Sequence, residues 1–194
     1  MNSTLQLFRI CILLLLPLCI SVGAQECATV DSAHTDETIS FLRKATSNPD
    51  VSEACVVTAI RKLQYAHSKE AIEVLIQYLD FKRHTRSQAV VTGSNSEVYP
   101  AISSLFAIGK PALPFLVRVA GGSAFEKVAQ ENAVRTIMMI YRDDPPAGIK
   151  YLLTEAERSQ DAGQRGLLRD AMRFGLRWCQ GERSKECESL VNAE

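Results

Sequence analysis

The chain has no net charge, and this absence argues against two classes of partner. Its 194 residues include 22 Lys and Arg residues and 22 Asp and Glu residues. Nucleic acids and anionic membrane surfaces select proteins with a basic excess. We therefore expect neither nucleic acid nor a lipid surface as the partner of this chain.

The sequence also lacks the signatures of catalysis and of metal binding. The three histidines, His34, His67 and His84, are scattered along the chain. None has the His-x-x-x-His or Glu-x-x-His spacing that presents metal ligands on one helical face. No Gly-x-Ser-x-Gly elbow, phosphate-binding glycine loop or dinucleotide motif is present. We therefore expect a protein that is not an enzyme and uses no cofactor and no metal.

Long apolar runs are absent except at the N-terminus. Arg9 precedes the apolar run Ile10 to Ile20, and small residues follow at Val22-Gly23-Ala24. This pattern is typical of a secretory signal peptide, here residues 1–24. The run is shorter than the ~20 residues of a membrane-spanning helix, so an uncleaved anchor is the weaker alternative. We expect residues 25–194 to be secreted or periplasmic, as one domain without a membrane span.

Four cysteines remain after such a cleavage. An even number of cysteines in an exported chain suggests disulfides, although four cysteines allow three pairings. We expect Cys27 to pair with Cys55 and Cys179 with Cys187, because each bond ties a chain end to the nearest helix. Free buried thiols remain an alternative. A zinc site is disfavoured because no Cys-x-x-Cys pair exists.

What the sequence does contain is a pair of motifs repeated four times. A small residue, an aliphatic residue, any residue, a bulky residue and leucine recur at residues 38–42, 71–75, 112–116 and 148–152. An alanine and a second apolar residue follow each of them, at residues 59–60, 101–102, 133–134 and 171–172. Successive copies lie about 33 to 41 residues apart, which is typical of two-helix solenoid repeats. We predict an all-α solenoid of about four helical hairpins over residues 35–178.

The apolar periodicity places the helices of these hairpins. They are expected at about residues 36–46, 52–66, 69–80, 97–109, 111–120, 124–141, 145–158 and 162–178. Residues whose side chains could cap helix N-termini are Ser68, Asp161, Asp50 with Glu53, and Ser123 with Glu126. Residues 25–34 then form an N-terminal segment, and residues 179–194 form a charged cap tethered at Cys187.

Two segments resemble HEAT-like repeats of the kind described in phycobilisome lyases. Asn48-Pro49-Asp50-Val51, the apolar positions of residues 54–63 and the run Ser68 to Leu79 resemble one unit, from its Asp-Pro-x-Val opening to its second helix. Residues 108–114 resemble the joint between two helices. The resemblance covers roughly residues 35–178 and implies stacked hairpins whose second helices line a concave face. It does not extend to di-iron HEAT-like hydroxylases, because their histidine-glutamate motifs are missing.

Basic residues recur along the expected concave face. The residues two positions after the repeated alanines are Arg61, Ser103, Arg135 and Arg173. Equivalent positions of successive repeats line up in a repeat stack. Lys62, Arg169 and Arg177 extend this mainly basic row. Such a row on a neutral chain would attract an acidic peptide or an anionic glycan. The alternative is an ordinary solvated helix face.

The second repeat is about nine residues longer than the others, and the excess falls within residues 81–96. A basic cluster opens this loop, before a short β-prone run. A long loop in a compact repeat array is commonly functional, although insertions on solenoid surfaces are tolerated at little entropic cost. The residues expected to bind are Arg61, Lys62, Lys82, Arg83, His84, Arg86, Arg135, Arg173 and Arg177.

These observations predict a non-catalytic scaffold exported to the cell envelope. It would recognise a protein partner, with acidic character, through the concave helix face and the 81–96 loop. The alternative is a receptor for an anionic ligand or glycan that uses the same basic groove.

Overall fold

The computed structural model describes residues 27, 30, 34–84 and 95–192, and the regular structure in these residues is entirely helical. The predicted signal peptide and Arg86 lie outside the described residues. The helices are α3 (Thr35–Ala45), α4 (Glu53–Lys62), α5 (Lys69–Ile76), α6 (Asn95–Val98), α7 (Pro100–Ile108), α8 (Leu113–Ala120), α9 (Lys127–Ile140), α10 (Pro145–Arg158), α11 (Ala162–Gly175) and α12 (Arg183–Asn192). The prediction of an all-α fold is confirmed.

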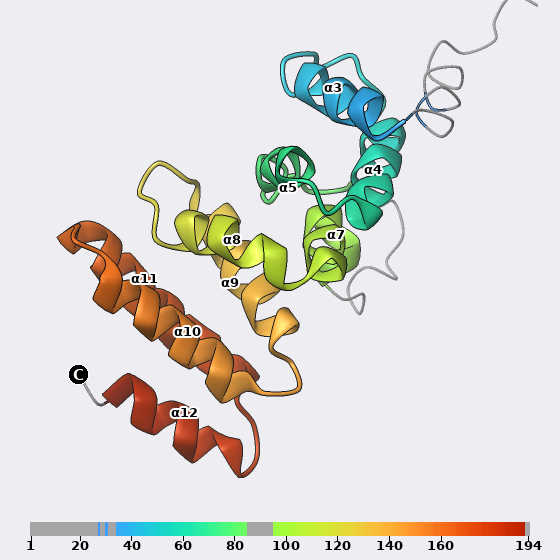
Figure 1. Cartoon of the computed structure of the whole chain (residues 1–194). Helices are drawn as coiled ribbons and strands as arrows, with labels where there is room; N and C mark the ends of the chain where they lie inside the picture. The colour runs from blue at the N-terminus through green and yellow to red at the C-terminus, as the bar shows by residue number, and fades with distance from the viewer. Residues whose placement is uncertain (1–26, 28–29, 31–33, 85–94, 193–194) are drawn as a thin grey trace, which may run out of the picture.

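The helices follow one another in space in the order of the chain. Figure 1 shows this progression from α3 (blue) at one end to α12 (red) at the other. Helix α4 packs on α7, α7 on α9 and α9 on α11, and we name these four helices the second-helix row. Helix α3 packs on α5, and α5 on α8, whereas α10 packs on α9, α11 and α12. Each helix therefore buries its apolar stripe against near neighbours in sequence.

Two of the predicted N-terminal helix caps are confirmed, and two others are wrong. The Ser68 hydroxyl accepts from the Ala71 N–H at 3.2 Å, and the Asp161 carboxylate accepts from the Gln164 N–H at 2.7 Å. The expected caps at Asp50 and Ser123 are wrong, because α4 and α9 start later than predicted. The N-cap of α4 is Ser52, and that of α9 is Glu126. Turns occupy the residues before both helices, so neither predicted side chain lies at a helix start.

A single apolar core runs along the helices, and a few buried polar side chains cross it. The Tyr78 hydroxyl donates to the Leu42 carbonyl of α3 at 2.6 Å. The Ser104 hydroxyl donates from α7 to the Ile60 carbonyl of α4 at 2.9 Å. In the described residues, every buried side-chain polar atom has a hydrogen-bond partner. Because an unpaired buried polar group is costly, these bonds fix how successive helices meet.

Both predicted disulfides are present. Cys27 is bonded to Cys55 in α4, and Cys179 to Cys187 in α12. At the N-terminal end, Lys62 Nζ also donates to the Val30 carbonyl at 3.0 Å. The predicted C-terminal cap contains a helix, α12, which packs on α10 and buries Cys187. Covalent bonds therefore tie both ends of the described chain to the core.

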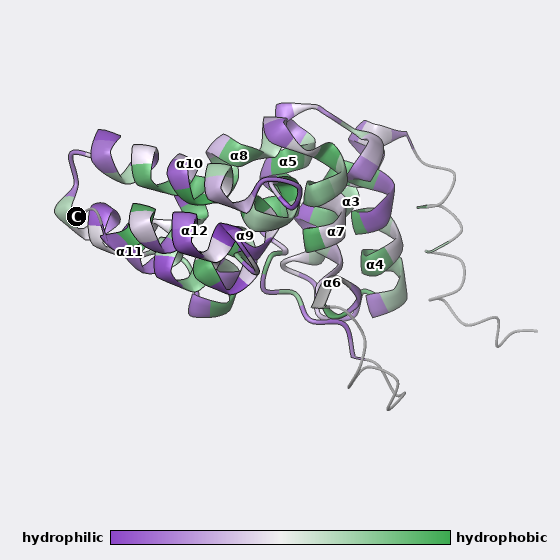
Figure 2. Cartoon of the chain, turned by 90° about the horizontal axis from the view of Figure 1, so that it is seen from below, coloured by the Kyte–Doolittle hydropathy of each residue, from purple (hydrophilic) through white to green (hydrophobic). Residues whose placement is uncertain are grey.

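Hydrophobic residues are distributed unevenly along the molecule. Figure 2 shows hydrophobic (green) residues concentrated where α5, α7 and α8 come together, and hydrophilic (purple) residues over much of α11 and α12. In the described part of the chain, no single helix is long and apolar enough to cross a membrane. Residues Pro100–Ile108 and Lys110–Ala120 reach that length and composition only as a pair, which bends by 111°.

Candidate binding surface

The structure divides the predicted binding residues between two places. Arg61, Arg83 and His84 line one surface hollow, whereas Arg135, Arg173 and Arg177 lie on α9, on α11 and just after α11. Lys82 is exposed, and Lys62 holds the N-terminal segment through the Val30 carbonyl. The predicted row therefore comprises two basic clusters joined by the neutral helix α7.

The first cluster surrounds a hollow beside α4, which we name the α4 hollow. It has a volume of ≈ 540 Å³ and is lined by Glu53, Ala54, Val57, Thr58, Arg61, Arg83 and His84. Its floor consists of small α4 residues three or four positions apart, which therefore share one helix face. Tyr65 follows about one turn after Arg61 and is 80% exposed. The hollow exists because the floor side chains are short while the side chains around them are long.

Residues 83 and 84 form the wall opposite α4, and hydrogen bonds hold them on two sides. The His84 N–H donates to Glu53 Oε1 at 2.7 Å, and His84 Nδ1 lies 2.8 Å from Glu53 Oε2. A carboxylate oxygen only accepts, so Nδ1 carries the proton in this contact. The Arg83 N–H donates to the Val98 carbonyl at the end of α6, at 2.8 Å. Arg83 is therefore fixed between α4 and α6 by its own backbone and that of its neighbour.

The charges of the α4 hollow do not cancel. Arg61 and Arg83 contribute two guanidinium groups to its lining. Of the described residues that line it, Glu53 alone carries a carboxylate, and both oxygens of that carboxylate already contact His84. With His84 neutral, the lining carries one net positive charge. Such a site attracts an anion with a single negative charge.

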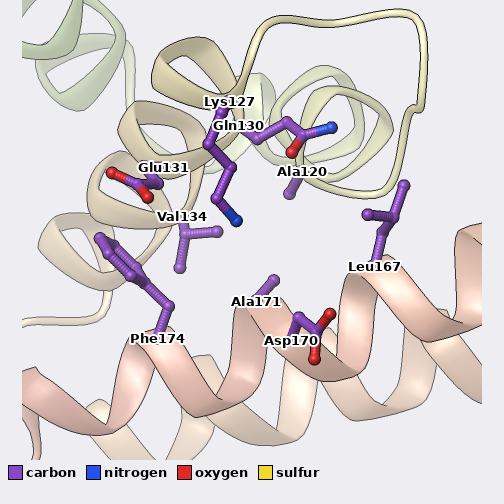
Figure 3. A pocket seen from close by; sticks show the side chains of 9 residues that line it. All are labelled: Ala120, Lys127, Gln130, Glu131, Val134, Leu167, Asp170, Ala171 and Phe174. Atoms are coloured by element: carbon purple, nitrogen blue, oxygen red, sulfur yellow. The ribbon is translucent and has the colours of Figure 1, made fainter.

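The second cluster lies where α9 and α11 pack together, and we name it the α9–α11 face. Figure 3 shows a small cavity there, with Lys127 and Glu131 projecting from α9, and Asp170 and Phe174 from α11. Its volume is ≈ 30 Å³, on the scale of a water molecule. Any partner on this face therefore binds to its surface rather than inside a pocket.

Arginines on the α9–α11 face contact side chains three positions earlier in the chain. Arg173 lies 3.0 Å from Asp170, and Arg135 donates to Asn132 Oδ1 at 2.9 Å. The Asn132 amide in turn donates to the Leu79 carbonyl at 2.7 Å, so a buried side chain positions Arg135. The Arg177 guanidinium lies 4.4 Å from the centre of the Phe174 ring. Local contacts therefore hold all three cations, and one tertiary bond, from Asn132, holds the partner of Arg135.

Burial affects one of these arginines. Desolvation lowers the pKa of Arg135, and the nearby charge of Arg177 acts in the same direction. Glu131 and Tyr99 oppose this shift by raising the pKa of Arg135. A guanidinium has an ordinary pKa far above neutrality, so Arg135 remains charged in this environment. The charges of Arg135 and Arg177 are thus close enough to interact.

A third hollow was not anticipated from the sequence. It has a volume of ≈ 410 Å³ and lies between the joint of α8 with α9 and the joint of α10 with α11. Its lining includes Arg118, Phe125, Asp161 and the turn Gly121-Gly122-Ser123. The signal in the sequence is this glycine turn before a helix, a position that can bind an anion, although the sequence favours a turn with an N-cap there. The mixed charge of this lining favours no ligand class.

Metal sites and known relatives give no further guidance. Within the described ranges, no group of three or more His, Cys, Asp or Glu residues is arranged to hold a metal ion. Comparisons of the chain with protein-family models, with curated proteins and with solved structures found no match. The function of this protein is therefore inferred from its own residues.

Proposed function

We propose that the protein is a non-catalytic, HEAT-like scaffold exported to the cell envelope, which binds an acidic segment of a partner protein along the second-helix row. The observation that carries this proposal is the placement of two basic clusters on one succession of packed helices, α4, α7, α9 and α11. The chain as a whole is neutral, so this placement concentrates positive charge on one part of the surface.

Helix contacts support the solenoid architecture. The four sequence repeats correspond to the hairpins α3–α4, α5–α7, α8–α9 and α10–α11. Each second helix contacts the second helix of the next hairpin. The ends of a repeat stack require caps, and here a disulfide ties a segment to each end. Two disulfides are also the bonding expected in an oxidising compartment, which supports export.

The distance between the two clusters favours an elongated partner segment. Three helix-to-helix steps separate α4 from α11, and each step is about 8–10 Å. A ligand that reaches both clusters therefore spans roughly 25–30 Å, which an extended peptide covers with about eight residues. The shallow α9–α11 face suits such a peptide, because it offers surface contacts and no enclosed pocket.

Binding of a model acidic peptide tests the proposal. A fluorescent peptide of alternating Glu and Ser, about twelve residues long, is titrated with the mature chain and followed by anisotropy. The variant Arg61→Glu/Arg135→Glu/Arg173→Glu should lose most of the binding. The matched control Arg43→Glu/Lys44→Glu/Lys150→Glu has the same charge change at exposed positions on α3 and α10, and it should retain binding.

Two results would contradict the proposal. Equal losses in the two triple variants would mean that net charge, rather than the second-helix row, determines binding. Binding of a polyuronate oligosaccharide without any binding of the peptide would favour the glycan-receptor alternative. Raising the salt concentration should weaken peptide binding in the wild-type chain, because exposed charges are screened beyond about 10 Å at 0.1 M salt.

A further inference from the structure

Contacts between distant parts of the chain hold the α4 hollow in place. Helix α4 packs on α3 and on α7, and the Cys27–Cys55 disulfide and the bond from Lys62 to the Val30 carbonyl tie the N-terminal segment to it. The opposite wall is fixed by the bonds of residues 83 and 84 to Glu53 and to Val98. The two arginines of the hollow are therefore mounted on anchored segments, which lowers the entropy lost when they bind a ligand.

The composition of the lining selects the charge of the ligand. Arg61 and Arg83 present planar donor groups that match the two oxygens of a carboxylate. The Glu53 carboxylate lies in the same lining and offsets one of the two guanidinium charges, so a ligand carboxylate with one negative charge makes the occupied lining neutral. A phosphate group carries nearly two negative charges at neutral pH and would leave the occupied lining with an excess of negative charge.

The surroundings of the hollow suit a side chain that belongs to a peptide. The floor residues Ala54 and Thr58 leave room for a carboxyl-bearing side chain. Tyr65, about one turn further along, exposes most of its ring and offers an apolar surface to the next residue of a peptide. Helix α4, which contributes most of the lining, is the first helix of the second-helix row, and the row continues through α7 and α9 to α11.

We infer that the α4 hollow binds the side-chain carboxylate of one Asp or Glu residue between Arg61 and Arg83, and that this contact anchors the partner segment. The inference rests on the proposed function, and it identifies the anchoring subsite. The α9–α11 face then adds weaker contacts along the same segment. Charge-assisted hydrogen bonds in a preorganised site outweigh those between mobile surface side chains.

Neutral substitutions of single arginines test the inference with the peptide of alternating Glu and Ser. Arg61→Gln and Arg83→Gln should each weaken binding by about ten- to a hundredfold, because each removes charge-assisted bonds to the carboxylate. Arg173→Gln removes the same charge from the α9–α11 face and should weaken binding by no more than about threefold. Lys150→Gln, at an exposed position of α10, should leave binding unchanged. Circular dichroism and thermal unfolding establish that each variant is folded.

Chemical shifts provide a second measurement that does not depend on variants. Addition of the Glu peptide should shift the amide resonances of Ala54 and Thr58 at lower peptide concentration than that of Ala171. A peptide with Gln in place of every Glu should leave all three resonances unchanged. These shifts report the site of contact in the wild-type chain, so they remain decisive if an arginine variant fails to fold.

The possible results separate the inference from the proposed function. If the peptide binds but Arg173→Gln weakens binding as much as Arg83→Gln, the anchoring role of the hollow is wrong and the proposed function stands. If a phosphoserine peptide binds more tightly than the Glu peptide by about tenfold or more, the assignment of a carboxylate is wrong. If the peptide does not bind the wild-type chain, both the proposed function and the inference fail.

Discussion

The two basic clusters of this molecule hold their arginines in different ways. In the α4 hollow, hydrogen bonds between segments far apart in the sequence place Arg83, because His84 contacts Glu53, 31 residues away. On the α9–α11 face, the contact of Arg173 with Asp170 lies within a single helical turn. One cluster is built by tertiary structure and the other by the local geometry of helices.

Because of this difference, the two basic clusters are expected to contribute differently to binding. A cation paired with a carboxylate on its own helix has already satisfied part of its interaction with anions. The backbone bonds of residues 83 and 84 instead place the Arg83 side chain in the lining of the hollow, where its guanidinium can meet a ligand. We therefore expect the α4 hollow to determine how tightly the partner segment is held, and the α9–α11 face to influence how fast it associates.

The largest expected effect tests whether the α9–α11 face depends on one tertiary bond. Asn132 is 2% exposed, donates to the Leu79 carbonyl and accepts from Arg135. Asn132→Ala should lower the free energy of unfolding by about 2–3 kcal/mol, because a buried carbonyl loses its donor and a small cavity forms. Urea unfolding followed by circular dichroism measures this change.

A local hydrogen bond in the same half of the molecule provides the control for Asn132. The Thr154 hydroxyl donates to the Lys150 carbonyl within α10, at 2.9 Å. Thr154→Ala should change the free energy of unfolding by less than about 0.5 kcal/mol. Equal losses of unfolding free energy in Asn132→Ala and Thr154→Ala would contradict the expectation that the tertiary contact is worth more than the local one.

The next largest effect concerns the pH dependence of stability. Burial raises the pKa of Tyr78 to about 12, and its hydroxyl donates to the Leu42 carbonyl. In the unfolded chain this phenol ionises near pH 10. Its contribution to stability is therefore complete below pH 10 and is lost as the pH rises toward 12. The Tyr78 contribution to this loss should reach about 1.4 kcal/mol by pH 11, measured as the difference between the wild-type chain and Tyr78→Phe in urea unfolding between pH 9 and pH 11.

Substitution of Tyr78 isolates this contribution. Burial, with the charge of Glu155 and the neighbouring Tyr141 adding to it, also raises the pKa of Tyr151 to about 12. Tyr78→Phe should therefore remove part of the alkaline loss, and Tyr151→Phe another part. An unchanged pH profile in Tyr78→Phe would mean that the contact between Tyr78 and α3 does not persist in solution.

Much of the fold could be predicted from the sequence, because the signals that specify it are local. Apolar residues at helical spacing located the helices, and the caps at Ser68 and Asp161 depend on side chains within three residues of the helix start. The disulfides followed from a similar argument, since each cysteine near a chain end lies close to the first or last helix.

The α4 hollow could be predicted only in part, because it depends on contacts between distant residues. Arg61, Arg83 and His84 were expected to bind, but no sequence pattern assigned them to a common site. Glu53 was interpreted as half of a capping box with Asp50, whereas its carboxylate contacts His84. Ser104, next to the uncharged position Ser103 of the row, is fully buried and donates to the Ile60 carbonyl. No local pattern encodes which distant carbonyl or amide a side chain meets.

Two substitutions of Glu53 test whether its contact with His84 positions Arg83 in the hollow. Glu53→Gln and Glu53→Ala remove the same negative charge, but only glutamine keeps an oxygen that accepts from the His84 N–H. If this contact positions Arg83, the Gln variant should bind the Glu peptide about three- to fivefold more tightly than the Ala variant. Anisotropy titrations of the two variants measure the ratio. Equal affinities would show that charge alone matters at Glu53.

The smallest expected effect tests the pairing of Arg173 on the α9–α11 face. Asp170→Asn removes a carboxylate from an exposed pair, so stability should change by less than about 0.5 kcal/mol. The Glu peptide should bind about twofold more tightly at low salt, because Arg173 no longer shares its charge with Asp170. Salt near 0.5 M should abolish the gain, since exposed charges are then screened within a few ångströms.

The control is Glu155→Gln, which removes the carboxylate that contacts Arg158 on α10, outside the second-helix row. A gain in Glu155→Gln equal to that in Asp170→Asn would show that the α9–α11 face contributes only net charge, and that the α4 hollow alone recognises the peptide.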